Sequence, residues 1–149
     1  MVKKLIIASL LPLSGLWAQG LSLTLGNPIA GQNYGMKTIA MFVFRINGCA
    51  DLSAAQVKAV GEGIVNNERR SQTLRPIPDP KPGVFALGRQ WSRGEKWVVA
   101  LTVTCGNETT AAIVPVKDDS FVRESAQLLS RAPRSAEIES ALKAYKLPQ

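Results

Sequence analysis

The stretch that decides the fold is residues 83–105, GVFALGRQWSRGEKWVVALTVTC. Residues 84–91 and 96–105 are rich in β-branched and aromatic residues, and the polar residues 92–95 lie between them. This pattern predicts a β-hairpin. Because every second side chain of a strand lies on the same face, one face of the second strand is expected to enter the core. That face carries Trp97, Val99, Leu101, Val103 and Cys105.

Five further segments have the same extended texture, with Gly, Asn and Pro between them. Residues 36–48 are apolar on both faces, which indicates a central strand. Asn66 and Asn67 tolerate positive φ and are expected to join two of the segments as a second hairpin. Pro115 favours a sheet edge or a strand end. The five segments are residues 21–26, 36–48, 56–65, 69–77 and 109–116.

Beyond residue 117 the spacing of apolar residues becomes helical. Ser120 is placed to cap a short helix that contains Phe121, and a strand is the alternative there. Residues 135–146 predict a helix more clearly, because Ser135 is a suitable cap, glutamates follow it and lysines end the segment. Its apolar stripe is expected to lie on a sheet and consists of Ile138, Leu142 and Tyr145.

Together these elements predict a mainly β fold. Seven extended segments, a long-range pair of cysteines and a tryptophan near one of them favour an immunoglobulin-like β-sandwich of about seven strands with a short C-terminal α-helix. No repeat or linker divides the chain, so residues 19–149 are expected to form one domain.

The first twenty residues, MVKKLIIASLLPLSGLWAQG, have the pattern of a secretory signal peptide. Lys3 and Lys4 precede an apolar stretch of about nine residues, which is too short to span a membrane of ~30 Å as a helix. Cleavage after Ala18 would remove residues 1–18 and lower the net charge from +7 to +5. We therefore expect an exported protein, periplasmic or extracellular, without a membrane span in the mature chain. An uncleaved membrane anchor is the alternative.

Cys49 and Cys105 are the only cysteines. Disulfides persist in the compartments that exported chains reach, so this pair is predicted to form one, with two buried free thiols as the alternative. The bond would close a loop of about 56 residues, for which the chain-entropy model gives roughly 4 kcal/mol.

The chain contains no histidine, which excludes Ser-His-Asp and Cys-His mechanisms and the usual histidine sites for zinc and copper. Asp118 and Asp119 are adjacent and are expected to point in different directions. The glutamates near residue 137 are explained by the start of a helix. We therefore expect no enzymatic activity, no cofactor and no metal site.

Three segments carry a family resemblance: AAQVKAVGEG (54–63), LRPIPDPKPGVFALGRQW (74–91) and GEKWVVALTV (94–103). In this order they resemble the YtkA-like/FixH-like immunoglobulin-fold domains of exported bacterial proteins, which implies an immunoglobulin fold over about a third of the chain. That family is often linked with copper handling or oxidase assembly. This chain lacks histidine, and Met36 and Met41 fit a hydrophobic core, so the resemblance transfers no metal ligands.

Basic residues gather in the two expected hairpins, and beside a tryptophan they could hold phosphate or carboxylate groups. Protection of exposed strand edges is the alternative role for these charges. The expected function is that of a non-enzymatic binding or accessory module of the bacterial cell envelope, whose partner is another envelope protein or an anionic polymer rather than nucleic acid. A structural envelope component without a ligand and a polyanion binder are the alternatives. The candidate residues are Arg69, Arg70, Arg75, Arg89, Trp91, Arg93 and Lys96.

Overall fold

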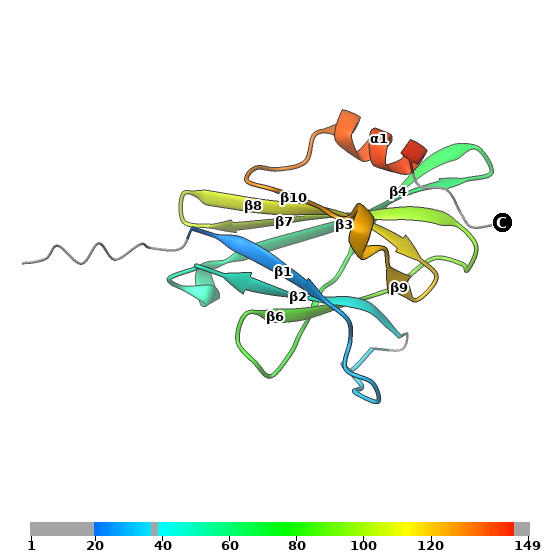
Figure 1. Cartoon of the computed structure of the whole chain (residues 1–149). Helices are drawn as coiled ribbons and strands as arrows, with labels where there is room; N and C mark the ends of the chain where they lie inside the picture. Colours follow the sequence, from blue (N-terminus) through cyan, green and yellow to red (C-terminus); the bar gives the residue numbers. More distant parts are fainter. Residues whose placement is uncertain (1–19, 37–38, 145–149) are drawn as a thin grey trace, which may run out of the picture.

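The structure is a computed structural model that describes residues 20–36 and 39–144. Two antiparallel sheets lie face to face, and one helix covers the outer face of the larger sheet (Figure 1). The four-stranded sheet has the order β1-β2-β6-β5. Its strands are β1 Ser22–Gly26, β2 Ala40–Asn47, β5 Ile77–Pro78 and β6 Val84–Gly88.

The six-stranded sheet has the order β10-β8-β7-β3-β4, and β9 pairs with β8 beside β10. Its strands are β3 Gln56–Val65, β4 Glu68–Leu74, β7 Lys96–Cys105, β8 Glu108–Lys117, β9 Ser120–Phe121 and β10 Gln127–Leu129. The helix is α1 Ser135–Ala144, and two 3-10 segments are η1 Leu52–Ala54 and η2 Arg123–Ser125.

The predicted fold class is confirmed. The order β1-β2-β6-β5 is that of strands A-B-E-D of an immunoglobulin fold, and β8-β7-β3-β4 corresponds to G-F-C-C′. Over the described residues the sheets contain ten strands rather than about seven. The difference arises because β5, β9 and β10 have only two or three residues, too few to show a periodic pattern in the sequence.

The first expected hairpin is wrong. The two runs flanking residues 92–95 become β6 and β7, which belong to opposite sheets: β6 pairs with β2, whereas β7 lies between β3 and β8. The connection from Arg89 to Glu95 is long enough to cross the gap of ~10 Å between packed sheets. In contrast, the hairpin of β3 and β4 is confirmed, and Asn66 and Asn67 have positive φ as its turn requires.

The core lies between the sheets. β2 lies between β1 and β6 in its sheet and contributes three fully buried residues to the core, Met41, Phe42 and Phe44. The inward face of β7 is also as expected, since Trp97, Val99, Leu101 and Val103 join the same cluster.

The C-terminal helix is confirmed over the described residues, and Tyr145 and Lys146 lie outside them. Ile138 and Leu142 pack with Ala141 into a second cluster, on the outer face of β7 and β8. Ser135 is the first residue of α1 and not its cap. The residue before it, Arg134, accepts from the backbone N–H of Ile138 and donates its own N–H to the Glu137 carboxylate.

The short helix expected from Ser120 is absent, and the alternative of a strand is correct there. Phe121 in β9 enters the core against Phe42, and β10 then pairs with β8. Pro115 lies within β8 rather than at the edge or end of the sheet. The carbonyl oxygen of Pro115 accepts a hydrogen bond from the backbone N–H of Val122. The N–H that Pro115 lacks would point in the same direction, toward the stretch where η2 separates β9 from β10, so no hydrogen bond of the sheet is lost there.

Cys49 and Cys105 form the predicted disulfide, with their Cα atoms 5.8 Å apart. The bond joins the end of β2 to the end of β7 and so ties one sheet to the other. Within the described ranges, no helix is both long and apolar enough to cross a membrane. The predicted signal peptide lies outside the described residues.

Candidate binding site

The structure does not bring the seven candidate residues together at one place. Arg69 lies on the face that α1 covers and pairs with Glu62, with 3.3 Å between Nε and Oε2. Lys96 is opposite Ile64 on the same face, and burial lowers the pKa of its ammonium group. Arg75 follows β4 and is exposed. The remaining four, Arg70, Arg89, Trp91 and Arg93, lie around the other side of the β3–β4 hairpin.

Two stacked tryptophans form the centre of this second group. The rings of Trp91 and Trp97 are nearly parallel, with centroids 4.5 Å apart. They rest on β3 where it has glycines: a Cβ at Gly63 would come within 2.3 Å of Trp97, and one at Gly61 within 2.8 Å of Trp91. Trp97 donates its Nε1–H to Glu95 over 2.8 Å. Both indoles are more than nine-tenths buried, so they act as a rigid support rather than as an open stacking surface.

Asp119 fixes the connection between β6 and β7 next to the tryptophans. Its two oxygens accept from Arg89, at 2.9 Å, and from Arg93, at 2.5 Å. Arg89 also donates to the backbone oxygen of Trp91. Asp118, which has a positive φ, accepts from the N–H of Gly94 at 3.2 Å. The two adjacent carboxylates thus both hold the β6–β7 connection.

The tryptophans and arginines border an open depression of about 670 Å³, called here the arginine–tryptophan depression. Its lining mixes two guanidiniums, two hydroxyls, a carboxylate and the amides of Gln72 and Gln90, which bond to each other at 3.0 Å. Arg70 pairs with Glu68 at 2.8 Å, Arg89 and Arg93 share Asp119, and Glu95 lies on the same rim, so three guanidiniums are matched by three carboxylates. A surface with balanced charge suits a neutral or mixed polar ligand better than a polyanion.

Sequence reasoning missed the residues that organise this depression. From the sequence, Asp119 is weighed only as one of two adjacent carboxylates, and Gly61 and Gly63 are given no role. The available signal was the occurrence of two glycines with spacing i, i+2 in a strand. Such a pair leaves room on one face for large side chains from elsewhere in the chain.

Among residues 20–36 and 39–144, no three His, Cys, Asp or Glu side chains come together in a way that could hold a metal ion. Met41 is fully buried in the core as expected. Met36 is not in the core: it is half-buried in the loop before β2 and belongs to neither hydrophobic cluster.

Comparisons with family models, with curated proteins and with solved structures found no match to this chain. The resemblance to YtkA-like/FixH-like domains therefore stays a prediction.

Proposed function

We propose that the protein is an exported immunoglobulin-like module of the bacterial cell envelope that acts by binding another envelope component. The observation that supports this most directly is the arginine–tryptophan depression. Two buried indoles and a carboxylate shared by two guanidiniums hold its walls in place before any ligand arrives. Such preorganisation lowers the entropic cost of association. The disulfide is in keeping with an oxidising compartment.

Site-specific photo-crosslinking in the native host tests this proposal. A photoreactive residue at Ser92, on the rim of the depression, is expected to yield a discrete adduct with one envelope component. The same group at Thr73, which is exposed on β4 and does not line the depression, serves as the control. Identical adducts at both positions, or none, would favour a structural component without a dedicated ligand.

The polyanion alternative predicts a different result. Binding to anionic polymers should then fall steeply with salt and weaken when Arg69, Arg70, Arg89 and Arg93 are replaced together. Intact mass of the secreted protein tests the export step separately: the expected chain begins at Gln19 and gains two thiols only after reduction.

A further inference from the structure

A second surface lies between the edges of the two sheets. β1 is the terminal strand of one sheet and β10 that of the other. A groove of about 260 Å³ separates them, called here the seam groove. It shares no lining residue with the arginine–tryptophan depression. Its apolar lining consists of Leu23, Leu25, Phe121, Ala126 and Leu128.

Leu128 is exposed without a role in the folded core. It is 59% exposed on β10, whereas its neighbour Leu129 turns inward and packs against the cluster beneath α1. Leu128 belongs to neither core cluster of the described residues. Phe121, which is buried, forms the bottom of the groove beside Leu128. An aliphatic side chain from a partner would therefore gain contacts with both residues.

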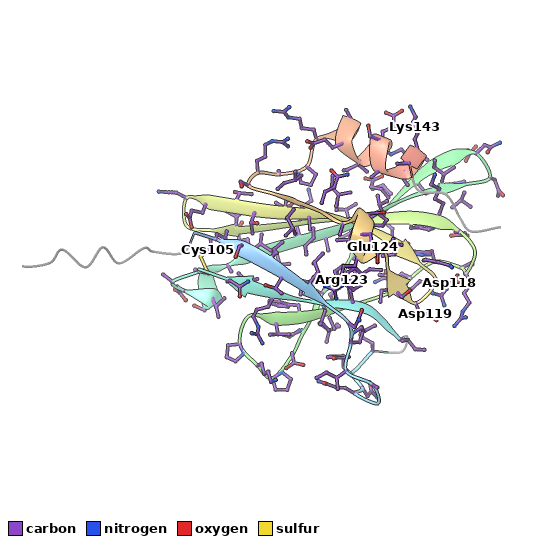
Figure 2. The ribbon with its side chains drawn as sticks, viewed as in Figure 1. Cys105, Asp118, Asp119, Arg123, Glu124 and Lys143 are labelled. Atoms are coloured by element: carbon purple, nitrogen blue, oxygen red, sulfur yellow. A yellow bond between two sulfur atoms is a disulfide. The ribbon has the colours of Figure 1, made fainter. Side chains whose placement is uncertain are left out.

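Arg123 gives the groove a positive wall. Its guanidinium lies 5.1 Å from the centre of the Phe121 ring and donates through Nη1 to the Leu25 carbonyl at 3.3 Å. Figure 2 shows Arg123 reaching toward β1. No carboxylate of the described residues lies within ion-pair distance of this guanidinium. Its remaining N–H donors are thus held beside an apolar surface, with a positive charge that no described carboxylate neutralises.

We propose that the seam groove binds an extended segment of a partner protein that carries an aliphatic side chain two residues away from a carboxylate. The volume is smaller than the ~300–1,000 Å³ of small-molecule sites and suits a single large side chain. One wall is the terminal strand β1, and the other runs from β9 through η2 to the terminal strand β10. An extended peptide matches such sheet edges. In an extended peptide, side chains at i and i+2 share a face, so one enters the groove while the other meets Arg123.

This proposal does not rest on the proposed function of the arginine–tryptophan depression, because the two surfaces have no residue in common. Loss of one activity would leave the other measurable.

A library of capped heptapeptides, panned against the disulfide-bonded protein, tests the inference. We expect enrichment of Leu or Ile two residues from Asp or Glu. Arg123→Gln should remove the acidic preference and weaken the selected peptide about tenfold, the size expected for one charge-assisted hydrogen bond. Leu128→Ser should remove the aliphatic preference. Matched controls are Arg75→Gln and Ile29→Ser, which change an exposed arginine and an exposed isoleucine outside the groove.

Because Arg123 also bonds to Leu25, the unfolding midpoint of each variant is measured first, and Arg123→Lys provides a second variant that retains the charge. That variant should keep the acidic preference. An unenriched library, or a selected peptide that binds Arg123→Gln and Arg75→Gln equally well, would overturn the proposal. So would Arg123-dependent binding to phosphatidylglycerol vesicles without peptide enrichment, which would assign the groove to lipid.

Discussion

At the scale of single residues, Gly63 determines where Trp97 can lie. A methyl group at this position would stand 2.3 Å from the indole, so Gly63→Ala must displace the stacked pair. Overpacking of this kind typically costs about 1–3 kcal/mol. We expect that loss in urea unfolding, together with a changed near-ultraviolet circular dichroism from the indoles. Gly26→Ala is the matched control, because its Cβ would be 3.4 Å from Val43, and an equal loss there would rule out the explanation.

Asp119 is the second residue with a large expected effect. Asp119→Asn leaves the Arg89 side chain, only 17% exposed, without its charged partner. Removing one partner from a partly buried pair costs about 1–3 kcal/mol, whereas exposed pairs contribute ~0–1 kcal/mol. Chemical unfolding should therefore show a clear loss for Asp119→Asn and almost none for Glu68→Gln, which breaks the exposed pair with Arg70. Similar losses in both variants would contradict the assignment of Asp119 as the clamp.

The sequence predicts some of these single-residue roles and not others. The pairing of Cys49 with Cys105 follows from having only two cysteines, and the inward direction of Trp97 follows from strand alternation. The roles of Gly63 and Asp119 depend on residues far away in the chain. No local sequence pattern indicates that Trp97 will lie on Gly63, 34 positions earlier in the chain. This part of the site could therefore be recognised only from the structure.

At the scale of elements, α1 depends on the half-buried carboxylate of Glu137. Arg131 and the backbone N–H of Arg134 lower the pKa of Glu137 from 4.5 to about 2. The folded state thus holds the ionised form more strongly than the unfolded chain does. The resulting stability is present above about pH 5 and is lost as the pH falls toward 2.

Urea unfolding at neutral and acidic pH checks this dependence. The wild-type protein should lose stability on acidification by more than Glu137→Gln does, because the variant has no carboxylate at position 137 to protonate. Glu124→Gln removes an exposed carboxylate that forms no ion pair with any described residue, and it should behave like the wild type. If Glu137→Gln and the wild type respond alike, the cap on α1 does not contribute to pH stability.

The elements also show why local sequence predicts pieces better than their pairing. α1 and the β3–β4 hairpin were predictable because capping charges, apolar stripes and the Asn66-Asn67 turn are local signals. The strand that pairs with β7 was not predictable from the sequence, because both β3 and β6 have apolar faces that would match it. The observed pairing is the one that satisfies both edges and both faces of β7. Its edges pair with β3 and β8, and its outer face is covered by α1.

At the scale of the whole molecule, the two sheets are fastened at opposite ends of the sandwich. Figure 2 shows Cys105 at one end and Asp118 and Asp119 at the other. The disulfide joins β2 to β7 at the first end. At the second end, Asp119 lies in the turn between β8 and β9. Its ion pairs with Arg89 and Arg93 attach this turn to the connection that crosses from β6 to β7. Both surfaces proposed for binding are therefore carried by a framework that cannot open at either end without losing a specific bond.

This arrangement predicts that the two fastenings contribute independently. Replacing Cys49 and Cys105 together by Ala should cost roughly 4 kcal/mol, because the unfolded chain regains the freedom of a loop with a sequence separation of 56. Asp119→Asn should cost about 1–3 kcal/mol in either background. Since the sites share no partners, their effects should add to within about 0.5 kcal/mol. Urea unfolding of the four proteins of this double-mutant cycle gives the coupling energy directly. A coupling well above that range would mean that the sheets separate from one end first, with the second fastening depending on the other.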